Sequence, residues 1–121
     1  MKLEVLVANE PALKTLVETK FDDAQFAWDL SIALDEVEKA IKKFHVDRDK
    51  YIKENGVADE KNPERFNIKD PDAFGKEMNK RLAVEVKINF PTLSLQEAIK
   101  SGIQLNVRDI SAFRKLGILT K

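Results

Sequence analysis

The chain has 121 residues, of which 43% are hydrophobic and 35% are charged, and its 21 basic and 21 acidic side chains cancel. This length fits one domain with a modest core, and the high charged fraction favours an elongated shape with a large surface. The neutral balance excludes a strong long-range attraction to nucleic acid or to an acidic membrane. Because there is no cysteine, disulfides, catalytic thiolates and cysteine metal sites are excluded, and an intracellular setting is favoured.

The N-terminal residues predict a β-strand over Lys2–Val7, because alternate side chains are apolar: Leu3, Val5 and Val7. Asn9 and Pro11 then predict the start of a short helix that runs to about Glu18. Polar residues interrupt the apolar run, which excludes a signal peptide. No apolar segment approaches the ~20 residues that span a bilayer, so we expect a soluble protein.

A long helix is predicted over Phe21–Asn55. Its apolar residues alternate in steps of four and three: Leu30, Leu34, Val37, Ile41 and Phe44. Thr19 and Asp22 resemble a capping box ahead of it, and Asn55 with Gly56 predicts a left-handed end. At about 1.5 Å per residue the helix would be about 50 Å long. A compact globule of this size is only ~30 Å across, so we expect the helix to protrude.

The sequence Asp70-Pro71-Asp72 predicts the start of a second helix, with an N-cap, a first-turn proline and a favourable acid. Its apolar residues recur every four positions, at Phe74, Met78 and Leu82. We expect this helix to fold back antiparallel on the distal part of the long helix, as a helical hairpin. Gly75 would permit a close approach between the two helices.

The segment "AVEVKINF" over 83–90 alternates apolar and polar residues, which predicts a strand. Ser94 and Glu97 form a capping box for a short helix through Lys100, and Ile103–Leu105 could add a strand. Asn106 or Asp109 opens the last helix. The terminal "ILTK" is apolar enough to dock on the core.

These elements predict an α+β fold: a long helix and an antiparallel return helix packed on a small sheet of two or three strands, with short C-terminal helices. The whole chain, residues 1–121, is predicted to form a single domain. The projecting helical hairpin occupies about 21–83. The small sheet and the short helices come from 1–20 and 84–121.

No catalytic or metal site is predicted. His45 is the only histidine, and its neighbourhood supplies no second and third partner, so we expect a surface or flanking position. The paired acids at Asp22 and Asp23 are better explained by the helix dipole. A calcium loop, a phosphate loop and a dinucleotide fingerprint are all missing from the sequence. We therefore predict no cofactor and no enzymatic activity.

Two surfaces are candidates for binding. The first is a basic patch that could face an anion if the hairpin pairs as proposed, formed by Lys42, Lys43, Lys80 and Arg81. The competing and favoured interpretation is a solvated face neutralised by the interleaved acids. The second is an oligomer interface, because one short return helix cannot cover the long helix. The apolar surface left for another copy is expected around Trp28, Ile32 and Ala40.

The stretch "KDPDAFGKEMNKRLAVEVKINF" resembles a family of small uncharacterised proteins encoded by tailed bacteriophages and prophages. The resemblance extends over about residues 30–117 and includes "KKFHVDRDKYIKENG", which ends a long charged helix in glycine, and "NVRDISAFRKLG", which forms a last short helix. It implies a phage origin, a location in the host cytoplasm and a function that is not enzymatic. It transfers no functional residue.

Two functions are therefore considered. One is a non-catalytic phage accessory or assembly protein that acts as a homo-oligomer, alone or with a host or phage protein. The alternative is an anti-defence protein that inhibits a host immune enzyme, or that sequesters a small anionic nucleotide between its subunits. Nucleic-acid binding is disfavoured by the neutral net charge and the lack of a convincing helix-turn-helix.

Overall fold

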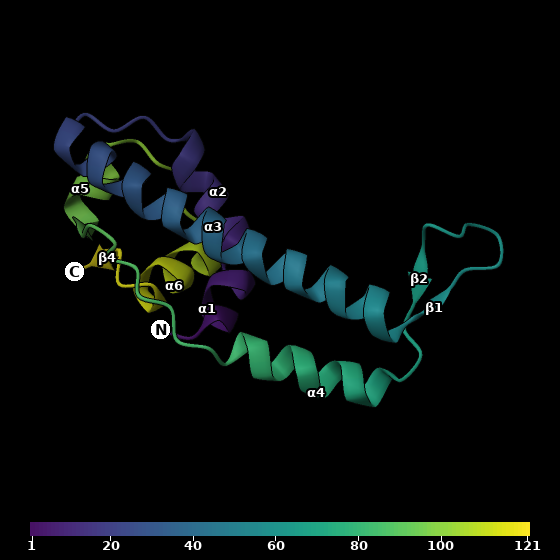
Figure 1. The fold of residues 1–121 in the computed structure, drawn as a ribbon. Helices are drawn as coiled ribbons and strands as arrows, with labels where there is room; N and C mark the ends of the chain where they lie inside the picture. Colours follow the sequence, from purple (N-terminus) through teal and green to yellow (C-terminus); the bar gives the residue numbers. More distant parts are fainter.

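A computed structural model describes all 121 residues and shows a mixture of helices and very short strands (Figure 1). The six helices are α1 (Leu3–Ala8), α2 (Glu10–Glu18), α3 (Ala24–Asn55), α4 (Pro71–Leu82), α5 (Leu95–Lys100) and α6 (Val107–Lys115). The four strands are β1 (Val57–Ala58), β2 (Phe66–Asn67), β3 (Leu93–Ser94) and β4 (Leu119–Thr120). The mixed helix and strand content and the long helix agree with the sequence prediction.

The long helix α3 has 32 residues and crosses almost the whole molecule in Figure 1. Its N-cap is Asp23, whose Oδ1 accepts hydrogen bonds from the backbone N–H groups of Gln25 at 3.0 Å and Phe26 at 3.1 Å. The predicted capping box was wrong, because the Thr19 hydroxyl donates back to the carbonyl of Thr15 at the end of α2. The buried residues of α3 lie at helical spacing: Phe26, Leu30, Ala33, Val37, Ile41 and Phe44.

Residues 3–8 form a helix, so the predicted N-terminal strand was wrong. The two side chains that α1 buries are Leu3 and Leu6, which are three residues apart and therefore share one helical face. Burial of this pair against the other helices stabilises the helical conformation of residues 3–8. A β-strand over these residues would need a neighbouring strand to accept its backbone hydrogen bonds, and neither sheet supplies one. Only Lys2 forms a bridge, with Glu85.

The predicted strand over 83–90 was also wrong, and the alternating burial holds only from Val86 onward, because Val84 is exposed. Val86, Ile88 and Phe90 pack against the core, while the polar residues between them are exposed. The segment runs extended past the N-terminus, where the Leu3 N–H donates to the Val84 carbonyl at 2.9 Å and the Val86 N–H to that of Met1 at 2.7 Å. No ladder continues beyond this point. Residues 103–105 form no strand either.

Instead of one sheet of two or three strands, the structure has two separate pairs. Strands β1 and β2 form an antiparallel hairpin at the distal end of α3. Strands β3 and β4 are parallel, with Leu93 opposite Leu119 and Ser94 opposite Thr120. The predicted docking of the C-terminal residues is confirmed, because Ile118 and Leu119 are both buried.

The caps of the later helices follow the prediction. Asp70 accepts from the Ala73 N–H at the start of α4. Ser94 caps α5: its Oγ accepts from the Glu97 N–H, and its hydroxyl donates to the Glu97 carboxylate. Asn106, rather than Asp109, is the N-cap of α6. The end of α3 differs, since Gly56 is extended (φ −95°, ψ −179°) and not left-handed.

The core contains 19 buried residues, all of them apolar, and it gathers α1, α2, α5, α6 and the first part of α3. Helix α4 contributes one residue to this core, Met78. Helix α4 contacts the distal part of α3 through the rings of Tyr51 and Phe74, whose centroids are 6.0 Å apart, and through Arg81 and Asp47. Gly75 does not mediate a close approach, because nothing lies within 4 Å of where its Cβ would stand.

Candidate interaction surface

A groove of about 880 Å³ runs between α2 and α3. Its floor is apolar, since Leu13, Leu16 and Val17 of α2 face Leu30, Leu34 and Ile41 of α3. The α3 side extends from Ala27 to Asp49, which is about 33 Å at about 1.5 Å per residue. The groove is therefore long enough and apolar enough to accept part of a macromolecule.

The rim of this groove carries both signs of charge. Its acids are Glu10, Asp35, Glu38 and Asp49, and its bases are Lys14 and Lys42. His45 also lines the groove, half-buried, and its Nδ1 atom is buried without a hydrogen-bond partner in the chain. The expected flanking position of His45 is thus the edge of the groove.

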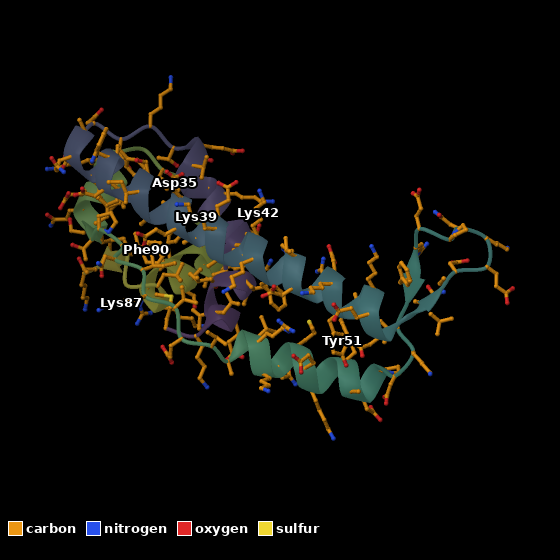
Figure 2. The ribbon with its side chains drawn as sticks, viewed as in Figure 1. Asp35, Lys39, Lys42, Tyr51, Lys87 and Phe90 are labelled. Carbon is orange, nitrogen blue, oxygen red and sulfur yellow. The ribbon has the colours of Figure 1, made fainter.

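The face of α3 that points away from the core carries three large exposed apolar side chains. Trp28 is 67% exposed, Val46 57% and Ile32 48%. Asp35 and Lys39 lie between them along the helix. Each is two residues from the buried Val37, which places it about 200° around the helix axis from Val37 and therefore on the opposite face. We name this face the outer stripe and define it by six residues: Trp28, Ile32, Asp35, Lys39, Lys42 and Val46. Figure 2 shows Asp35, Lys39 and Lys42 following one another along α3.

The outer stripe and the groove form one continuous surface, because Asp35, Lys42 and Val46 belong to both. Of the predicted interface residues, Trp28 and Ile32 lie on the stripe, whereas Ala40 is half-buried and packs against the core. The sequence analysis missed Val46 and Val17, which is 68% exposed. Val46 could have been found as an apolar residue that does not fit the alternating steps of four and three.

Among the four residues of the predicted basic patch, Lys42 and Arg81 lie on different sides of α3. Arg81 lies at the contact between the helices, within 3.5 Å of Asp47 and 3.1 Å of Glu77. Lys42 lines the groove, and it points about 140° around α3 from Asp47. Lys43 and Lys80 are exposed. The charge of Arg81 is thus shared with two carboxylates, and a ligand-binding role for the four residues stays a prediction.

No three histidine or acidic side chains lie close enough together to hold a metal ion. None of the helices is both long and apolar enough to pass through a bilayer. Comparison of the chain with protein-family models, with curated proteins and with solved structures finds no match. The geometry of the groove and the outer stripe is accordingly the basis for the function proposed below.

Proposed function

We propose that the protein is a non-catalytic interaction protein, encoded by a phage, that acts as a homo-oligomer. In this proposal α3 and α4 form a projecting helical hairpin, and the first part of α3 supplies the contact between copies. The phage origin is supported by the sequence resemblance of residues 30–117. The oligomer is supported by the exposed apolar surface, which is the observation that carries the proposal.

The accessible surface of the single chain is 8861 Å². A folded monomer of 13.8 kDa is expected to expose about 6,600 Å². The chain therefore exposes about 2,200 Å² more than a compact protein of its mass. A stable complex of standard size needs about 800 Å² from each partner. The excess is large enough to supply such an interface.

Part of the exposed apolar surface lies where a second copy could cover it. Trp28, Ile32 and Val46 lie on one face of α3, beside Val17 and the apolar floor of the groove. Tryptophan is among the residues most enriched at the centres of protein interfaces. Exposed large apolar side chains that lie beside an apolar groove favour an interaction site on a soluble protein. The divergence of Lys42 from Arg81 favours this function over nucleotide sequestration between subunits.

Light scattering coupled to gel filtration tests the proposal. We expect the mass to rise above that of one chain with increasing concentration. Replacing two interface residues together, Trp28→Gln with Ile32→Gln, should return the protein to one chain. The matched control removes two exposed apolar residues elsewhere, Ile99→Gln with Val107→Ser, and should leave the mass unchanged. A wild-type protein that stays monomeric at high micromolar concentration would contradict the proposal.

A further inference from the structure

The outer stripe is self-complementary about its midpoint. Measured from Val37, Trp28 and Val46 lie nine residues away in opposite directions, and Asp35 and Lys39 lie two residues away. Ile32 and Lys42 lie five residues away. The residues at equal distances from Val37 therefore have complementary chemistry. Trp28 and Val46 are both apolar, and Asp35 is an acid where Lys39 is a base. Ile32 corresponds to Lys42, whose side-chain stem is aliphatic.

This pattern fits an antiparallel second copy. With a two-fold axis at the level of Val37, Trp28 would meet the partner's Val46, and Asp35 would meet the partner's Lys39. Ile32 would lie against the side-chain stem of the partner's Lys42. Because a two-fold contact is isologous, each of these pairs would occur twice. The paired stripes extend over about 27 Å from Trp28 to Val46, at about 1.5 Å per residue.

The charges of the stripe are free to make these contacts. Five ion pairs occur within the chain, and none includes Asp35, Lys39 or Lys42. All three side chains are exposed. A parallel copy in the same register would instead place Asp35 against the partner's Asp35 and lysine against lysine. Like charges held together in this way disfavour the parallel arrangement, so the charge pattern selects the antiparallel one.

We propose that the protein dimerises through the outer stripe of α3, paired antiparallel with that of a second copy about a two-fold axis near Val37. This inference rests on the homo-oligomer proposed above and names its contact surface. The apolar ends of the stripe stabilise the pair, and the central charges set its direction. The groove beside the stripe is left to enclose the flanking residues of the partner helix.

Two charge reversals test the pairing: Asp35→Lys and Lys39→Glu. Each places like charges opposite one another twice in the dimer, so each variant alone should raise the dissociation constant at least about tenfold. An equal mixture of the two variants restores opposite charges at both places. We therefore expect the mixture to associate about as tightly as the wild-type protein, with one copy of each variant in the dimer.

Trp28 supplies the readout, because it is the only tryptophan and is largely exposed in the single chain. Burial against the partner's Val46 should shift its emission to shorter wavelength as the concentration rises. Sedimentation equilibrium gives the dissociation constants. The matched controls, Glu60→Lys and Lys61→Glu, make the same charge changes in the exposed loop between β1 and β2 and should alter neither measurement.

The outcomes separate the two proposals. A monomeric wild-type protein contradicts both. A wild-type oligomer that both charge reversals leave intact contradicts the stripe pairing and leaves the homo-oligomer standing. If each variant is monomeric but the mixture does not associate, the antiparallel register is wrong. If the protein associates only with a different protein added to the sample, the stripe binds that protein and not a second copy. This outcome would contradict the inference.

Discussion

Gly75 lies inside α4 with open space around the position where a Cβ would stand, whereas Gly56 does not. At Gly56 a Cβ would overlap the backbone carbonyl oxygens of Ile52 and Asn67, where α3 ends against β2. The two glycines therefore have opposite roles. Gly75 lowers the stability of a helix for no packing benefit, while Gly56 allows two backbone segments to approach each other.

We expect Gly75→Ala to raise the free energy of unfolding by about 0.4–1 kcal/mol, because alanine restricts the unfolded chain and favours the helix. Gly56→Ala is the matched substitution and should lower it by about 1–3 kcal/mol, because the backbone must move to admit the methyl group. Urea unfolding followed by circular dichroism measures both. A destabilising effect at Gly75 would show that its space is filled by a contact absent from this structure.

The N-caps of the later helices could be predicted from the sequence, because each depends on only a few neighbouring residues. Asp70, Ser94 and Asn106 are N-caps because each stands directly before a helix, and each accepts a backbone N–H three residues later. The cap of α3 was harder. Thr19 and Asp23 both precede the apolar run, and the choice depends on where the chain leaves α2, which a local pattern does not contain.

The prediction of single elements failed where the pattern was short. Over six residues, the apolar positions of α1 fit both an alternating strand and a helix that buries Leu3 and Leu6. The segment that contains Val86 and Ile88 keeps its alternating burial without forming a ladder, because only the first residues of the chain lie beside it. Alternation therefore reports which side chains are buried, while the number of strands depends on tertiary neighbours.

Several side chains attach α4 to the rest of the protein, but only Met78 among them is fully buried. We expect Met78→Ala to open α4 locally, because truncating a buried methionine costs about 2–5 kcal/mol and α4 has no other fully buried residue to hold it. Hydrogen exchange should become faster in α4 and stay unchanged in α1 and α6. The control, Lys76→Ala, alters an exposed residue of the same helix. Equal acceleration throughout the core would mean that α4 unfolds only with the whole protein.

At the scale of the whole molecule, the predicted protrusion of the long helix agrees with the large accessible surface. The sequence indicated this from charge content and helix length alone. It did not indicate the groove, because the groove depends on how α2 and α3 are held apart by α1 and α6. The outer stripe was recognised in part from Trp28 and Ile32, and Val46 could have been added as an apolar residue outside the alternating steps of four and three.

Small-angle X-ray scattering tests the shape. A compact chain of 121 residues has a radius of gyration of about 14 Å. We expect a clearly larger value, and a longest dimension of at least about 48 Å, the length of α3 at about 1.5 Å per residue. The Asp35→Lys variant, extrapolated to zero concentration, provides the single chain. A radius near 14 Å with a longest dimension shorter than α3 would contradict the extended arrangement.

Helix α3 contains neither proline nor glycine between Ala24 and Asn55, so it has no built-in site for a kink. One end is fixed in the core, and the other carries the β1–β2 hairpin and α4 (Figure 1). A force applied at the β1–β2 hairpin would therefore be transmitted along α3 to its buried end. It would tilt the buried end of α3 beside α2, because the helix has no built-in hinge between the two ends.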